Sequence, residues 1–283
     1  VQTNVASSAA QARAEGLIIA SVAAAAIAWL IFMLPHSIVT VSVATAYYTR
    51  ISTAASNGDM ASMKADLLAA LRLIVIFMSL ATAGLIVLAY PLARIFSPGL
   101  PEAEALGNVI IALAVGLLPF SLVHMLQRAF FALEDTKTPF IFTSIQVALH
   151  IIGAITLLNV LDKQWLVVGL SLVTASTVTI QLLIAGVLLR KKIDWQPTGL
   201  VLNLLRSIIA AVIAGVIGFV AIDQLGGIGA GWLMESKLNA SLGAVLITLL
   251  MVISFLFLTR ALRLPEYGII TKFLVEIRRR NES

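Results

Sequence analysis

The chain has 283 residues, of which 60% are hydrophobic and 12% are charged, with a mean hydropathy of +1.03 and a net charge of +5. Soluble domains carry about a quarter charged residues, so this composition excludes a soluble globular enzyme. The apolar excess and low net charge exclude a disordered chain. The lack of cysteine excludes disulfides and thiolate metal sites. The composition predicts an integral membrane protein.

Seven apolar stretches are long enough to cross a bilayer, which takes about 20 helical residues. The predicted transmembrane helices cover residues 16–49, 65–96, 102–133, 138–161, 164–192, 199–224 and 238–263. A polar external loop at 1–15 precedes them, and a cytoplasmic amphipathic helix at 264–283 follows. The first helix would be about 50 Å long, more than the ~30 Å of the hydrocarbon core. We therefore expect it to kink at Pro35.

Lysine and arginine are unevenly divided between the two sides of the membrane that these helices imply. One side receives only 4 of the 19 basic residues, namely Arg13, Arg94, Lys163 and Lys237, and the other receives 15. Positive residues accumulate in cytoplasmic loops, so the richer side is predicted to be cytoplasmic. The chain then starts outside and ends in the cytoplasm. From this external start we expect further helices upstream of Val1.

Several predicted helices carry one stripe of polar side chains among apolar ones. Thr143, Gln146 and His150 follow at i, i+3 and i+7, which places them on one helix face. Polar groups are costly in lipid, so such stripes indicate a hydrated cavity with apolar outer walls. Serine and threonine also bond their own backbone or a neighbouring helix, so packing is the alternative for them. The candidates for the lining of a transport cavity are His36, Thr40, His124, Gln146, His150 and Gln181.

Motifs for catalysis and for cofactor binding are absent from the sequence. It has no H-E-x-x-H, G-x-S-x-G, P-loop or C-x-x-C pattern, and no two carboxylates share a face within a predicted helix. We therefore expect no catalytic residue, no metal site and no cofactor. The basic residues accompany no nucleic-acid-binding motif. A transporter needs a polar cavity and two conformations, so transport is the favoured function.

Two stretches carry a resemblance to a known family. The first is LPHSIVTVSVATA at 34–46, followed by RISTAASNGD at 50–59, and the second is RAFFALEDTKTPF at 128–140. Both resemble the MviN/MurJ family of lipid II flippases, in the MOP superfamily of multidrug, oligosaccharidyl-lipid and polysaccharide exporters. The second stretch matches the family's loop pattern R-A-F-Y-A-x-x-D-T-x-T-P at every fixed position except Phe131. Its loop residues are Arg128, Glu134, Asp135, Thr136, Thr138 and Pro139.

The resemblance implies an all-α, polytopic membrane fold with two lobes of helices. Residues 16–192 would form the second lobe, and residues 199–263 would form two extra C-terminal helices. The implied function is translocation of lipid II, the undecaprenyl-linked peptidoglycan precursor, from the inner to the outer leaflet of the bacterial plasma membrane by alternating access. The implied partners are lipid II, membrane lipids, an N-terminal lobe of the same protein and cell-wall synthesis proteins.

The loop motif and the function each have an alternative interpretation. In the loop we expect Asp135 or Thr136 to cap the following helix. We also expect Arg128 to pair with Glu134 or Asp135, and a gating role for this corner is the alternative. Two other functions fit the sequence. One is another MOP exporter, such as a multidrug antiporter or a lipid-linked oligosaccharide flippase, and the other is a non-transporting membrane scaffold for cell-wall enzymes.

Overall fold

The computed structural model describes residues 22–227, 229 and 231–262. Within these residues the chain is helical and contains no strand. Among the described residues, six helices are long and apolar enough to cross a membrane, and a bent pair counted as one span makes a seventh. The predicted all-α, polytopic membrane fold is therefore confirmed. The predicted external loop at 1–15 and amphipathic helix at 264–283 lie outside the described residues.

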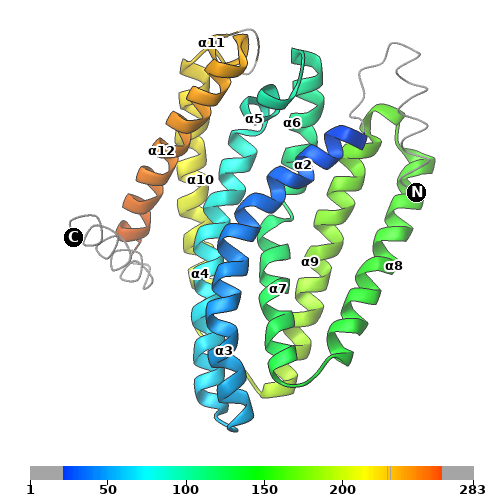
Figure 1. Ribbon diagram of the computed structural model, residues 1–283, viewed down its shortest axis with the longest axis vertical. Helices are drawn as coiled ribbons and strands as arrows, with labels where there is room; N and C mark the ends of the chain where they lie inside the picture. The colour runs from blue at the N-terminus through cyan, green and yellow to red at the C-terminus, as the bar shows by residue number, and fades with distance from the viewer. Residues whose placement is uncertain (1–21, 228, 230, 263–283) are drawn as a thin grey trace.

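The described elements are helices joined mostly by short connections (Figure 1). In chain order they are α2 (Val22–Pro35), the π-helix η1 (His36–Val41), α3 (Ser42–Ser56), α4 (Met60–Val87), α5 (Ala89–Phe96), α6 (Leu100–Ala114), α7 (Leu117–Ala132), α8 (Lys137–Val160), the 3₁₀ turn η2 (Lys163–Trp165), α9 (Leu166–Ile193), α10 (Leu200–Gln224), α11 (Trp232–Glu235) and α12 (Lys237–Ala261). The last four predicted spans coincide with α8, η2–α9, α10 and α12 to within about two residues, which is the usual uncertainty of a helix end.

The first membrane span continues past its predicted end at residue 49 and reaches Ser56. Arg50 ends the apolar stretch, but a charged residue does not end a helix. Here the Arg50 guanidinium pairs with Asp66 of α4 at 2.6 Å. The helix stops before Gly58, whose φ of 73° is easily reached only by glycine. The axis changes direction between α2 and α3, at the π-helix that follows Pro35 (Figure 1).

Two predicted helices, those at 65–96 and 102–133, are each divided in two. α4 gives way to α5 at Leu88, and α6 gives way to α7 at Gly116, where the two axes differ by 41°. Each break lies about one turn before a proline, Pro91 or Pro119. Proline has no N–H to donate, and its ring clashes with the carbonyl four residues earlier. The helical hydrogen-bond pattern is therefore interrupted at both places.

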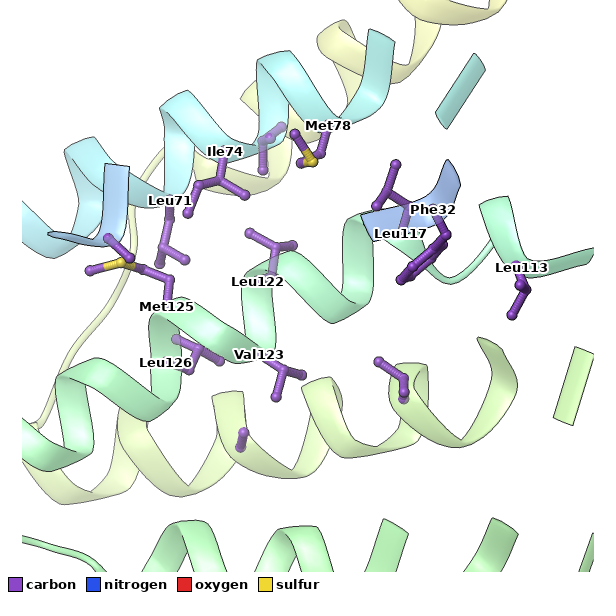
Figure 2. Packing of buried hydrophobic residues seen from close by; sticks show 14 of the residues in the cluster. Phe32, Leu71, Ile74, Met78, Leu113, Leu117, Leu122, Val123, Met125 and Leu126 are labelled. Atoms are coloured by element: carbon purple, nitrogen blue, oxygen red, sulfur yellow. The ribbon is translucent and has the colours of Figure 1, made fainter. Parts of the chain in front are cut away.

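The centre of the bundle is an apolar core to which α4, α6, α7 and α9 contribute, with α2 and α3 packed against it. Figure 2 shows Leu71, Ile74 and Met78 of α4 facing Leu122 and Met125 of α7. All five side chains are buried. Lipid tails are as apolar as these residues, so close packing, and not exclusion of water, holds such helices together. α7 is thereby fixed in the middle of the bundle.

The remaining long helices flank this core on opposite sides (Figure 1). α10 packs on α4 and on α12, and small separate apolar clusters join these helices to each other. α8 packs mainly on α9. Only 11% of its most apolar segment is buried among the described helices, the lowest share of the six continuous spans. This loose attachment of α8 leaves space between α7, α8 and α9.

Candidate functional site

A pocket of about 280 Å³ lies between α2, α6, α7, α8 and α9, and we call it the interhelical pocket. Three of the predicted cavity residues, His124, Gln146 and Gln181, line it. Thr143 and Thr174 add two hydroxyl groups to the same lining. Polar stripes from the third, fourth and fifth predicted helices therefore meet at one place inside the bundle.

Two side-chain hydrogen bonds tie α8 to α9 beside the interhelical pocket. Gln146 Nε2 donates to Thr177 Oγ1 at 3.2 Å, and Gln181 Nε2 donates to Thr143 Oγ1 at 3.1 Å. Each helix thus contributes one amide and one hydroxyl. Polar groups at this depth need partners within the protein, since the hydrocarbon core supplies none. The polar stripes therefore serve helix packing as well as the pocket.

Two predicted cavity residues, His36 and Thr40, are not in the pocket lining, and of the two His36 contacts residues that line it. His36 and Thr40 are on η1, with exposed fractions of 2% and 0%. His36 Nδ1 lies 3.0 Å from Ser121 Oγ of α7 and shares a hydrogen bond with it. The His36 ring also approaches the His124 ring, with 5.3 Å between centroids. His124 therefore connects the buried His36 to the interhelical pocket.

His150 is placed differently from the other candidates. It lies on α8 and is half-buried, but it is not among the residues that line the pocket. Its Nδ1 is buried and has no hydrogen-bond partner among the described residues. The sequence spacing that groups it with Gln146 therefore does not bring both side chains into the same lining.

Sequence reasoning missed two parts of the pocket lining. Gln127 follows His124 at i+3, so its spacing alone could have identified it. The second part is an aromatic wall in which Trp29 stacks on Phe32 at 5.2 Å and Phe120 packs edge-on against Phe32 at 5.5 Å. Aromatic residues in an apolar helix give no signal that separates a pocket from a lipid-facing surface. Only the packing identifies this wall.

The chemistry of the lining is neutral and hydrogen-bonding. It contains one imidazole, from His124, and the three amides of Gln127, Gln146 and Gln181, but no carboxylate. In the parts of the chain that the structure describes, no three histidine, aspartate or glutamate side chains come close enough to hold a metal ion. The interhelical pocket can therefore hydrogen-bond a polar ligand, but it offers no negative charge to balance a cation.

The loop motif forms a corner between α7, α8 and the end of α9, which we call the loop corner. Asp135 accepts hydrogen bonds from the backbone N–H of Thr138 at 3.0 Å and from its Oγ1 at 2.7 Å. Asp135 is therefore the cap of α8, whereas the side chain of Thr136 makes no capping bond. Pro139 occupies the first turn, where a missing N–H costs nothing.

The predicted ion pair of Arg128 is not formed. Among the described residues, Arg128 pairs with neither Glu134 nor Asp135, and its guanidinium lies over the ring of Tyr48 at 5.4 Å. Asp135 pairs instead with Lys192 of α9, at 2.9 Å. Lys192 comes from a distant part of the chain, so the loop sequence could not indicate it as the partner.

The loop corner strongly favours the charged form of Asp135. The hydrogen bond from the Thr138 backbone N–H, and then that from the Lys192 ammonium, hold the pKa of the Asp135 carboxyl far below its ordinary value of 3.8. The carboxylate is thus a charged link that holds the start of α8 against the end of α9.

The residues of the interhelical pocket and the loop corner all fall within one family match. The family described as "Lipid II flippase MurJ" matches residues 1–229. The chain belongs to this family. The resemblance of the two sequence stretches to MurJ is thereby confirmed. With its several apolar helices, this member of the MurJ family is a multi-pass inner-membrane protein.

Individual relatives agree with the family match. A protein of Rhizobium meliloti (strain 1021), described as "Probable lipid II flippase MurJ", is 30% identical over 203 residues, which cover 69% of this chain and 37% of that protein. A solved structure described as "Lipid II flippase MurJ, inward closed conformation" matches with a TM-score of 0.61 at 20% identity, over 85% of this chain and 48% of that one. This chain therefore has the MurJ fold and spans no more than about half the length of these relatives.

Proposed function

We propose that the chain forms the second lobe and the two C-terminal helices of a lipid II flippase. The whole protein would move lipid II from the inner to the outer leaflet of the bacterial plasma membrane by alternating access. The observation that carries this proposal is the MurJ match over residues 1–229. We assign the second lobe to residues 16–192 and the extra helices to residues 199–263. The activity is transport, so we assign no catalytic residue.

The size and lining of the interhelical pocket suit one half of a binding surface for the lipid II headgroup, with the other half on another lobe of the protein. The headgroup of lipid II carries sugars, a peptide and a pyrophosphate, which are very costly to place in hydrocarbon. The pocket holds about 280 Å³, which is small beside the ~300–1,000 Å³ of ordinary ligand sites. We infer that the headgroup binds between this polar surface and a facing N-terminal lobe of the same protein. The polyprenyl tail stays in the lipid.

The test uses cells that are depleted of their own flippase and supplied with the protein that carries this chain. The measured quantity is lipid II accessible at the outer leaflet. Gln181→Leu removes the amide that lines the pocket and bonds Thr143. We expect it to lower translocation about tenfold, the effect of losing ~1.4 kcal/mol of stabilisation.

Thr179→Val is the matched control, because Thr179 is on the same helix and its Oγ1 donates only to the Ala175 carbonyl of that helix. This variant should translocate lipid II at nearly the same rate as the unmodified protein. Failure of the unmodified protein to restore outer-leaflet lipid II would refute the proposed function. Equal rates for the two variants would instead remove the interhelical pocket from the transport path.

A further inference from the structure

The π-helix η1 begins with a buried histidine that is held from the neighbouring helix. His36 follows Pro35 directly, is 2% exposed, and shares the hydrogen bond with Ser121 Oγ of α7. Thr40, four residues further on η1, is fully buried, and its Oγ1 has no hydrogen-bond partner among the described residues. Short π-helical segments are rare and are frequently found at functional sites.

A second histidine stands against the first. The rings of His36 and His124 lie 5.3 Å apart between centroids and are nearly perpendicular, at 87°. His124 Nε2 is buried and has no partner within the described residues, while the side chain lines the interhelical pocket. A buried polar atom without a hydrogen-bond partner is destabilising. Two such atoms, on His124 and Thr40, lie on the two helices that meet here, η1 and α7.

Other ionisable groups around this pair are sparse. α2 and η1 carry none besides His36, and on α7 the nearest is Arg128, which acts electrostatically on His124. The other ionisable residues on the helices packed against η1 and α7 are Tyr47, Tyr48 and Arg50 of α3, Lys64, Asp66 and Arg72 of α4, Lys137 and His150 of α8, and Arg190, Lys191 and Lys192 of α9. Arg50 is paired with Asp66, and Arg128 lies over Tyr48. No carboxylate among the described residues is therefore available to neutralise a charged imidazole pair.

We propose that His36 and His124 form one proton-binding site, reached from the interhelical pocket, whose protonation changes the packing of η1 against α7. A hydronium ion in the pocket transfers its proton to the lone pair of one imidazole nitrogen: an N–H bond forms, one O–H bond breaks, and water is left. Only one proton binds, because two positive charges about 5 Å apart in a buried site repel strongly. An imidazole in water changes charge between about pH 5 and 8. Burial without a neighbouring carboxylate disfavours its charged form in the present arrangement, so proton uptake favours an arrangement in which the charged ring gains hydrogen bonds.

The protonated pair favours a different arrangement for a physical reason. Protonation turns an unpartnered acceptor into an N–H donor, which then needs an acceptor of its own. Ser121 Oγ of α7 and the unpartnered Thr40 Oγ1 of η1 are the buried hydroxyl oxygens on these two helices. A shift of η1 that brings such an oxygen to the new donor gains hydrogen bonds that the present arrangement lacks. If the protein is a flippase, as proposed above, proton uptake would then favour one conformation of its transport cycle. This last step of the inference rests on the proposed function.

The test uses the protein that carries this chain and measures two quantities: the rate of lipid II translocation and the distance between two helices. Lipid II translocation is measured between about pH 5 and 8. A pair of spin labels, at Ile38→Cys on η1 and Leu183→Cys on α9, reports the distance between these helices. Both positions are strongly exposed, with exposed fractions of 68% and 64%. The chain has no cysteine of its own, so only cysteines elsewhere in the protein have to be replaced. We expect a several-fold change in translocation and a shift of the label distance over the same pH interval.

His36→Gln and His124→Gln should each remove both pH responses, and His150→Gln is the matched control that keeps them. A label distance that ignores pH would overturn the proton site, as would a translocation rate that is high but independent of pH. Loss of both responses in His150→Gln would overturn it too. If the label distance responds to pH but lipid II never moves, the proton site stands and the proposed function fails.

Discussion

Asp135 joins three parts of the chain through one carboxylate. It caps α8 through Thr138 and holds α9 through Lys192. The sequence predicts the cap, because an acidic residue just before a helix is a common signal. It does not predict Lys192, because nothing in the local pattern indicates where the end of α9 lies.

At this residue we expect Asp135→Ala to lower the free energy of unfolding by about 1–2 kcal/mol. Loss of the cap accounts for ~1 kcal/mol, and the partly exposed ion pair adds at most ~1 kcal/mol. Thermal unfolding of the purified protein in detergent measures the effect. Glu134→Ala is the control, since the side chain of Glu134 makes no hydrogen bond or ion pair among the described residues. Equal losses for both variants would contradict the role assigned to Asp135.

The stabilisation by Asp135 should also depend on pH in a defined direction. Its pKa is lower in the folded protein than the ordinary 3.8, so protonation favours the unfolded state. The contribution is therefore fully present above about pH 4 and is lost progressively as the pH falls below that value. The difference in melting temperature between the unmodified protein and Asp135→Ala should be constant from pH 7 to about pH 5 and shrink below about pH 4. A difference that is unchanged at pH 3 would be evidence against this linkage.

At the scale of elements, the contact between α7 and α9 depends on a glycine at the start of α7. A Cβ on Gly116 would lie 2.9 Å from the Ala175 Cα and 3.0 Å from its Cβ. These are closer than atoms normally approach, and one of them is backbone, so the helices would have to separate. Gly116, which lies at the break between α6 and α7, therefore allows α7 to approach α9 closely because it has no Cβ.

We expect Gly116→Ala to destabilise the protein by about 1–3 kcal/mol, the usual cost of overfilling a packed site. The matched control is Gly186→Ala on α9, where a Cβ meets no atom within 4 Å. That variant should unfold at the same temperature as the unmodified protein or slightly above it, because alanine favours helix over glycine. The comparison is again made by thermal unfolding in detergent. An equal decrease in unfolding temperature for both variants would show that the close approach of α7 to α9 does not cause the destabilisation.

At the scale of the whole molecule, the basic residues gather at one end of the bundle. The α3–α4, α7–α8 and α9–α10 connections meet at the lower end in Figure 1, whereas α5, α11 and the α8–α9 connection lie at the upper end. Lys64 donates to the Asp194 carbonyl and Arg72 to the Thr198 carbonyl, so basic side chains of α4 also hold the α9–α10 connection in place. The uneven charge distribution thus has a structural role besides its predicted role in orientation.

Single-cysteine labelling tests the proposed orientation, with the basic end in the cytoplasm. Asn57→Cys lies in the α3–α4 connection and Gly229→Cys in the α10–α12 connection, and both positions are exposed. Because this chain lacks cysteine, each variant gives one site once any other cysteines of the protein have been replaced. In spheroplasts, a membrane-impermeant maleimide should label Gly229→Cys, and it should label Asn57→Cys only after permeabilisation. The reverse pattern would invert the topology.

The sequence by itself determined the membrane class, the seven spans, the uneven charge and the family, because these properties depend on composition and on short-range patterns along the chain. It also identified His124, Gln146 and Gln181 as polar positions on their helices. The tertiary structure decided which polar stripes meet, that His36 bonds Ser121 beside the pocket, and that His150 lies outside its lining. In a bilayer every helix is apolar almost all round, so hydrophobicity does not select its neighbours. That choice depends on shape and hydrogen bonding between segments far apart in sequence, which only the folded chain contains.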